Sequence, residues 1–219
     1  MIEPETPLLT DAELADLPVF PLPAAVLFPG TSIGLHLFEP RYRALMRHCL
    51  EKGPRAMAIA HLRPGLFEAD YAGQPPIFEI AGAGRIVSHR GNADGTFDLI
   101  LEGTQRVRLH ELPFVPPFRR ARAESVPDVN DDETALNRVA EALGLAELLR
   151  SLVHASPVPI APNLPSRLGR QLDFAANQLV RDPALRQELL ETTDAERRAM
   201  RVHEIVRGQS DRERRRRMN

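Results

Sequence analysis

Few residues in this sequence have the types and spacing that catalysis, cofactor binding or metal binding requires. His203-Glu204 would begin a helical zinc pair, but Arg207 occupies the position one turn later where the second His is needed. Gly82-Ala83-Gly84 begins the glycine pattern of a dinucleotide-binding loop, but Val87 and an expected strand follow where a helix must start. Cys49 lies on the apolar side of an expected short helix, which favours a small buried residue over a nucleophile. These patterns predict a protein that is not an enzyme and that has no cofactor and no metal site.

The composition is that of an ordinary globular protein with little net charge. Of the 219 residues, 43% are apolar and 26% are charged, and the formal net charge is −2. So small a net charge draws the whole molecule neither to nucleic acid nor to an anionic membrane. The acidic, proline-broken N-terminus is not typical of a signal peptide, and no window approaches about 18 consecutive apolar residues. The lack of such a window and the small net charge predict no membrane partner. Because there is a single cysteine, we expect a reducing compartment, the cytoplasm.

The chain ends in an arginine-rich run, Arg212-Glu213-Arg214-Arg215-Arg216-Arg217. Arginine neutralises phosphates and releases their counterions, so a phosphate-binding tail is one interpretation. Against it, the run is short, lacks interleaved aromatic residues and belongs to a net-acidic protein. We therefore prefer a solvated, frayed helix end, and we treat residues 208–219 as an Arg-rich tail.

Short strands dominate the first half of the sequence. They are expected at Leu17–Leu22, Ile33–Phe38, Met57–Leu62, Ile77–Ala81, Gly84–Arg90, 97–102, 106–110 and Arg119–Val126. A short helix is expected from Pro40, which suits a first turn, to Gly53-Pro54. Turns are expected at Gly91–Gly95 and at Gly103-Thr104. This pattern predicts a small barrel or sandwich over residues 16–128, after an N-terminal tail of residues 1–15.

From about residue 129 the apolar period changes from 2 to 3.6, which predicts an all-helical part over residues 129–207. Asn130 with Glu133 can start a helix that runs to about Val153. After a linker at Pro157–Pro165, a second helix carries apolar residues from Leu168 to Val180. Asp182-Pro183 then caps a third helix, and Thr193–Glu196 fits the capping box of a fourth.

Several motifs, in this order, resemble the N-terminal substrate-binding domain of Lon proteases. Leu17–Leu22 followed by Val26–Gly30 is similar to the opening of that domain. Phe38-Glu39-Pro40-Arg41-Tyr42 resembles the F-E-P-R-Y stretch of its stand-alone bacterial members. Gly84-Arg85-Ile86 with Leu101–Leu109 resembles the G-x-x-R element around its hairpin, and Arg119–Glu124 resembles its closing strand. The resemblance spans about residues 16–207. It is more diffuse in the second half, where Arg198 stands near a position that is usually apolar in the family.

The resemblance implies an α+β fold, in which a PUA-like β pseudo-barrel of about six strands and a short helix precedes an all-helical bundle. It also implies a member that lacks the ATPase and peptidase domains, because the catalytic Ser-Lys pair of Lon lies further along its chain. We therefore expect no protease activity.

Two interpretations of the motif residues stay open. In the structural one, Glu39 and Arg41 fix the corner between strand and helix by charge-assisted bonds. Phe38 and Tyr42 then fill the edge of the barrel, and Gly103 supplies a positive φ. In the binding one, Arg41, Tyr42 and Arg106 line a surface groove that holds an extended peptide.

The leading hypothesis for function is a non-catalytic module that binds peptide or protein segments. Apolar side chains expected to be exposed in the Phe28–Ile33 and Leu66–Tyr71 loops motivate it. The alternative is an RNA-binding protein, because PUA-like barrels often bind RNA. RNA recognition usually needs a basic face with stacking aromatic residues, whereas this chain has two Tyr, no Trp and a negative sum of charges. Nucleic acid is therefore the less favoured partner.

Overall fold

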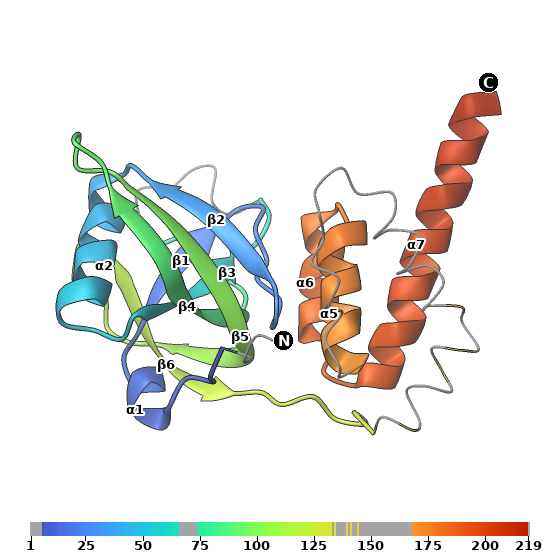
Figure 1. Cartoon of the computed structure of the whole chain (residues 1–219), viewed down its shortest axis with the longest axis horizontal. Coiled ribbons are helices and arrows are strands. Elements are labelled where there is room, and N and C mark those ends of the chain that lie inside the picture. The colour runs from blue at the N-terminus through green and yellow to red at the C-terminus, as the bar shows by residue number, and fades with distance from the viewer. Residues whose placement is uncertain are drawn as a thin grey trace, which may run out of the picture. The chain divides into compact units, whose positions relative to one another are not determined.

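A computed structural model describes residues 6–65, 74–132 and 168–218, and four isolated positions, 134, 139, 141 and 144. The chain divides into two compact units, residues 4–127 and 128–219, which we call the β unit and the helical unit (Figure 1). Each unit is described by itself. No helix in the described ranges is both long enough and apolar enough to cross a membrane.

The β unit contains one mixed sheet of six strands. They are β1 (Leu17–Leu22), β2 (Ser32–Leu37), β3 (Ala56–His61), β4 (Ile80–Gly91), β5 (Phe97–Glu111) and β6 (Arg119–Ser125). The sheet order is β2-β5-β4-β3-β1-β6, and a further pairing of β6 with β5 closes five of the strands into a barrel. Among the paired strands of this sheet, β1 with β3 is the one parallel pair, and the other pairs are antiparallel. The predicted α+β class, with six strands followed by helices, is confirmed.

The long strand β5 differs from the prediction. The turn at Gly91–Gly95 is present, since Asn92 N donates to Thr96 O at 2.9 Å and Gly95 has a φ of 79°. The prediction of a second reversal at Gly103-Thr104 is wrong, because β5 continues through these two residues and is 15 residues long. In the same way, the strands expected at Ile77–Ala81 and Gly84–Arg90 are not separate, because β4 runs without a break from Ile80 to Gly91, and Ile77 forms only an isolated bridge with Leu62. A register shift between β4 and β5 at Ala83/Gly84 interrupts the alternation, and the sequence pattern read as a turn is a β-bulge.

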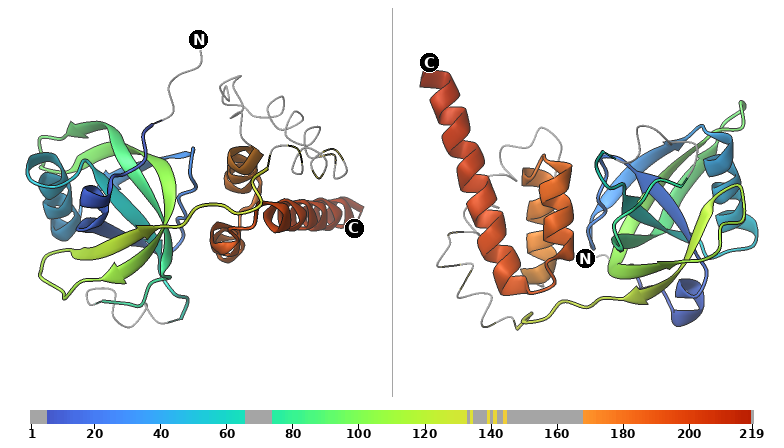
Figure 2. Two further views of the ribbon diagram at one scale, coloured as in Figure 1. Left: turned by 90° about the horizontal axis from the view of Figure 1, so that it is seen from below. Right: turned by 180° about the vertical axis from the view of Figure 1, so that it is seen from behind.

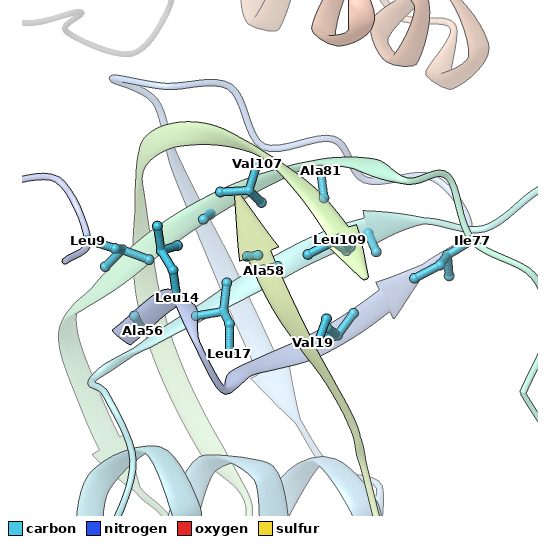
Figure 3. Packing of buried hydrophobic residues seen from close by; sticks show 14 of the residues in the cluster. Leu9, Leu14, Leu17, Val19, Ala56, Ala58, Ile77, Ala81, Val107 and Leu109 are labelled. Atoms are coloured by element: carbon cyan, nitrogen blue, oxygen red, sulfur yellow. The ribbon is translucent and has the colours of Figure 1, made fainter. Parts of the chain in front are cut away.

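The bulge lets β5 contribute to two separate cores. Beyond it, Val107 and Leu109 point into the barrel interior, where they meet side chains of β1, β3, β4 and β6 (Figure 3). Before it, Leu99 and Leu101 belong to a second core, which is covered by helix α2 (Pro40–Glu51). The second core contains Phe20, Leu27, Leu37, Tyr42, Leu45, Met46, Cys49, Met57, Ile59, Ile86, Leu99 and Leu101. The predicted short helix is thereby confirmed, and its apolar side is the one that packs.

Gly103 is required for close packing. The described glycines with a positive φ do not include it, so the conformational reason expected from the sequence is wrong. A Cβ at Gly103 would collide with the Phe28 carbonyl oxygen, and one at Gly82 would collide with that of Leu27. The Leu27-Phe28 segment therefore crosses the sheet at a distance that only glycine permits.

The N-terminal segment is part of the barrel, although the sequence suggested a tail over residues 1–15. Leu9 and Leu14 are buried in the barrel interior, and helix α1 (Asp11–Leu14) begins with a capping box between Thr10 and Glu13. Arg85 of β4 holds this segment, because its guanidinium bonds to the carboxylate of Glu13 at 2.7 and 2.9 Å.

The helical unit contains α5 (Leu168–Leu179), α6 (Pro183–Glu191) and α7 (Ala195–Met218) (Figure 2). Asp182 caps α6 as predicted, since its carboxylate accepts from Ala184 N at 2.8 Å. The cap of α7 is Asp194 instead of Thr193, because Asp194 accepts from Arg197 N at 3.0 Å. Helix α7 continues through the arginine-rich run that was expected to be a frayed tail. Most of the helix expected from Asn130 to Val153 lies outside the described residues.

Candidate functional site

The corner between β2 and α2 brings Glu39, Arg41 and Tyr42 together. Glu39 stands just before α2 and Pro40 occupies its first turn. Arg41 Nε donates to Glu39 Oε2 at 2.9 Å, and a second guanidinium nitrogen lies 2.8 Å from the same oxygen. The Arg41 guanidinium also lies over the Tyr42 ring, 4.6 Å from its centroid. These contacts hold Arg41 in a fixed direction at the surface.

The three residues predicted to line a peptide groove differ in accessibility. Tyr42 is 5% exposed and packs on Phe20, with the ring centroids 4.3 Å apart. Arg106 is 3% exposed and lies on β5, directly opposite Gly82 of β4. Arg41 keeps 22% of its side chain exposed. The structure therefore joins Arg41 to Tyr42 and places Arg106 inside the unit, and their binding role stays a prediction.

Phe38 lies on the surface, although it was expected to fill the edge of the barrel. Its side chain is 62% exposed. It continues the alternation of β2, in which Ser32, Gly34 and His36 are exposed and the residues between them are half-buried or buried. The Phe38 and His36 rings stack with their centroids 6.1 Å apart. The strand thus presents a polar and aromatic row to solvent.

Asp98 of β5 collects polar partners from all three neighbouring segments. His36 Nδ1 lies 2.7 Å from its carboxylate, Asn92 Nδ2 donates at 2.9 Å, and Arg90 lies at 3.3 Å. Hydrogen bonds from Asn92 and then from His36 lower the pKa of Asp98 to about 2. Asp98 is therefore ionised at neutral pH.

Two apolar residues lie near this network. Ile100 of β5 is exposed, and its cross-strand neighbours are Gly34 on β2 and Ser88 on β4. Val87, at the irregularity of β4, is exposed as well. A Cβ at Gly34 would meet no atom within 4 Å, so the surface beside Ile100 is open. We call the exposed set the outer strip; it consists of Gly34, His36, Phe38, Val87, Asp98 and Ile100.

Of the outer strip, the sequence analysis named Phe38 as a motif residue and did not predict the other members as part of a site. Phe38 was named for its motif, but the pairing that joins Asp98 to His36 spans 62 positions along the chain. The expected hairpin at Gly91–Gly95 could have placed Asp98 opposite Arg90, which is their register in the structure. Nothing in the sequence indicated which strand would flank β5 on its other side.

The Phe28–Ile33 loop, which was expected to expose apolar residues, does not provide the site. Phe28 is completely buried, as are its neighbours Val26 and Leu27, so the expectation for the Phe28–Ile33 loop is wrong there. The physical reason is that this segment packs against Gly82 and Gly103. The Leu66–Tyr71 loop lies outside the described residues.

The described residues contain no cluster of His, Cys, Asp and Glu that could hold a metal ion. Cys49 is completely buried on α2. Desolvation raises the pKa of its thiol to about 12, so the side chain stays protonated and packs as a small apolar residue.

Comparison with known proteins connects this geometry to a family. The model of the ATP-dependent protease La (LON) substrate-binding domain matches residues 16–208. The chain belongs to the Lon substrate-binding domain family. The resemblance read from the motifs is therefore confirmed, including its extent along the chain.

Relatives of this Lon substrate-binding domain are themselves Lon proteases. A Lon protease of Porphyromonas gingivalis is 24% identical over 195 residues, which are 85% of this chain and 23% of that protein. Lon protease 2 of Syntrophobacter fumaroxidans is 27% identical over 144 residues, 66% of this chain and 18% of that protein. The chain thus spans less than a quarter of the length of these relatives. What matches is the substrate-binding domain and not the peptidase.

Solved structures of Lon N-terminal domains share the fold. A Lon N-terminal domain protein from Xanthomonas campestris aligns with a TM-score of 0.60 and 24% identity, over 85% of this chain and 96% of that one. The N-terminal domain of a Mycobacterium avium complex Lon protease aligns with a TM-score of 0.64 and 18% identity, over 87% of this chain and 97% of that one. At these identities the likeness establishes the arrangement of strands and helices.

Proposed function

We propose that this Lon substrate-binding domain binds unfolded polypeptide segments without catalysing a reaction on them. The observation that carries the proposal is the outer strip, where Phe38, just after β2, is exposed together with Val87 on β4 and Ile100 on β5. Exposed apolar residues that gather on one surface are typical of protein interaction sites. The relatives named above are proteases, and their substrates are polypeptides.

The strip favours weak binding to many sequences. Complete burial of one large apolar side chain contributes roughly 1.5–3 kcal/mol. Three partly exposed residues therefore offer a few kcal/mol, from which the entropy of ordering the peptide is subtracted. The expected affinity is on the order of micromolar. Affinities of this order suit a module that samples unfolded chains and releases them.

Polar groups at the ends of the strip supply orientation in this proposal. Arg41 has a planar guanidinium that can hold a carbonyl or a terminal carboxylate of a bound peptide. The ring of Tyr42 supports the Arg41 guanidinium through the cation–π contact. Arg106 would act from inside the unit, where it lies buried on β5, the strand that also carries Ile100. We place the protein in the reducing cytoplasm, because its single cysteine is free and buried.

Fluorescence polarisation of a labelled unfolded polypeptide tests the proposal directly. The probe is reduced, carboxymethylated α-lactalbumin, and the variant is the double substitution Phe38→Ser with Ile100→Ser. We expect the dissociation constant to rise about tenfold in the variant, because roughly 1.4 kcal/mol of apolar contact is lost. The matched control is Met200→Ser, an exposed apolar residue of the helical unit, which should bind as the parent does.

Two results would contradict the proposal. One is no binding of the unfolded probe up to high micromolar concentrations of the parent protein. The other is binding of a labelled RNA that is lost at modest salt concentration, together with no binding of the polypeptide. That result supports the alternative function, RNA binding.

A further inference from the structure

Strand β2 lies at one end of the sheet order, and β5 is its ladder partner among the described strands (Figure 1). The ladder pairs Ser32 with Glu102 and continues without interruption to Leu37 and Phe97. Its other side therefore carries backbone groups that no strand of the described ranges occupies. Such a side is an open sheet edge.

The direction of these backbone groups follows from one hydrogen bond. Gly103 N donates to Thr31 O at 2.8 Å, so the carbonyl of Thr31 is directed toward β5. In an antiparallel ladder, hydrogen-bonded and non-hydrogen-bonded pairs alternate. Counting from Thr31, it is Ser32, Gly34 and His36 that direct their N–H and C=O groups away from β5 to the open edge.

This edge lacks the features that usually prevent another strand from pairing. Protected edges carry Lys, Pro, a bulge or inward-pointing charges. The sequence of β2, Ser-Ile-Gly-Leu-His-Leu, contains none of these, and its register with β5 has no irregularity. The side chains of Ser32, Gly34 and His36 are exposed, and the space above Gly34 is open. Side chains of an added strand would find room there.

We propose that β2 receives an extended polypeptide segment as an added strand, paired through the backbones of Ser32, Gly34 and His36. This inference rests on the proposed function and specifies how the polypeptide is held. The alternating N–H and C=O groups of the edge are complementary to another extended backbone, which repeats at about 3.3 Å per residue. Backbone pairing is independent of sequence, while alternate apolar side chains of the segment would extend the outer strip beside Gly34 and Phe38.

A peptide with a modified backbone tests the pairing, using the full chain. The probe is a fluorescein-labelled twelve-residue peptide in which Val and Thr alternate. Two derivatives carry N-methyl groups on every second residue, one derivative on the Val residues and the other on the Thr residues. In a given register an added strand pairs through only one of the two sets, and a shift by one residue would turn the other type of side chain, Val or Thr, toward the outer strip. We therefore expect one derivative to bind at least tenfold more weakly than the parent peptide and the other to bind nearly as well.

A pair of variants at Gly34 tests the same edge from the protein side. Gly34→Pro removes one outward N–H donor from an edge position where proline does not interrupt the ladder with β5. Gly34→Ala keeps the donor and adds a methyl group in open space. We expect the Gly34→Pro protein to bind the Val/Thr peptide at least threefold more weakly, with the same melting temperature as the parent protein. The Gly34→Ala protein should bind the peptide as the parent does.

The outcomes separate this inference from the proposed function. If both N-methylated peptides bind as the parent peptide does, strand addition is wrong, although binding of unfolded α-lactalbumin would still support the proposed function. If neither polypeptide binds, both proposals fail. If sedimentation shows a dimer that Gly34→Pro dissolves, the occupant of the edge is a second copy, and the assignment to a polypeptide segment is overturned.

Discussion

The guanidinium of Arg198 on α7 holds the carboxylate of Asp128, 70 positions earlier in the chain, through two bonds of 2.6 and 3.0 Å. Arg198 is completely buried, and its Nε lies 3.3 Å from the buried carboxylate of Asp173 on α5. A third bond, of 2.7 Å, joins Arg198 to the Thr192 carbonyl. Burial lowers the pKa of Arg198, but Asp173 and Asp128 outweigh this and leave it above its ordinary value. One side chain thus ties the first residue of the helical unit to the helices α5 and α7.

Replacing Arg198 should be the most damaging single change in the helical unit. Arg198→Leu leaves two carboxylates, Asp128 and Asp173, without their buried partner, which typically costs about 3–5 kcal/mol of unfolding free energy. The control is Arg197→Ala, one position earlier and exposed, for which we expect a change within about 0.5 kcal/mol. Urea denaturation followed by circular dichroism measures both. An Arg198→Leu protein as stable as the Arg197→Ala control would show that the buried pairs contribute nothing.

The Glu13–Arg85 contact should make the β unit sensitive to acid. The hydrogen bond from Arg85 lowers the pKa of Glu13 from 4.5 to about 2. A carboxyl group with a lowered folded-state pKa contributes stability above its unfolded value, and the contribution is lost as the pH falls from about 4.5 to 2. After allowance for solvent screening, we expect a loss on the order of 1 kcal/mol. The pKa of Asp98 is also about 2, so its contribution to stability is lost over a similar range of pH.

Glu13→Gln distinguishes the contribution of Glu13 from that of Asp98. The variant should be less stable than the parent at pH 7, and the difference should disappear near pH 2. Denaturation midpoints measured across this range provide the test. The control is Glu124→Gln, whose side chain is exposed and whose removal should leave the curve unchanged. A difference between parent and Glu13→Gln that is constant with pH would contradict the assignment.

Three glycines of the β unit should respond to alanine in opposite ways. In Gly82→Ala or Gly103→Ala the added methyl group meets the backbone carbonyl of Leu27 or Phe28, which cannot yield without moving the segment. We expect a loss of at least about 1–3 kcal/mol for each. Gly34→Ala meets nothing and should be neutral or slightly stabilising, since alanine restricts the unfolded chain. Thermal denaturation of the three variants decides the matter, and equal losses at all three positions would refute the packing argument.

Cys49 should be unreactive until the protein unfolds. It is completely buried, and its pKa of about 12 leaves almost no thiolate at neutral pH. Ellman's reagent should therefore react far more slowly with the native chain than with the chain in 6 M guanidinium chloride. Rapid reaction at pH 8 without denaturant would mean that α2 opens readily from the second core.

The sequence predicts elements better than contacts between distant segments. The alternation of Phe97, Leu99 and Leu101 predicted a half-buried strand, and Pro40 and Asp182-Pro183 predicted helix starts, because these signals are local. The role of Gly103 was predicted wrongly, because the sequence does not distinguish a glycine that packs against the Phe28 carbonyl from a glycine in a turn. Arg198 could not be placed, because its two carboxylate partners, Asp173 and Asp128, lie 25 and 70 positions away in the chain.

The candidate site shows the same limit. The motif around Phe38 and Arg41 was identified from the sequence, but whether each side chain faces solvent or core depends on how β2 continues into α2. The outer strip combines three strands whose order in the sheet, β2-β5-β4, differs from their order in the chain. Only the pairing of β2 with β5, across a separation of more than 60 residues, makes Asp98 and His36 neighbours.

Because β5 belongs to the barrel interior at one end and to the second core at the other, it couples their fluctuations. Separation of either half of this strand from its neighbours exposes the bulge and with it the attachment of the Leu27-Phe28 segment. Amide protons of Leu99 and Val107 should therefore exchange with solvent through the same rare global opening, with equal free energies. Strand β2, which pairs with β5 alone among the described strands, should exchange through a smaller and more frequent opening. The surface proposed to recruit unfolded chains would then be the one part of the sheet that can loosen and reclose while the rest of the barrel stays intact.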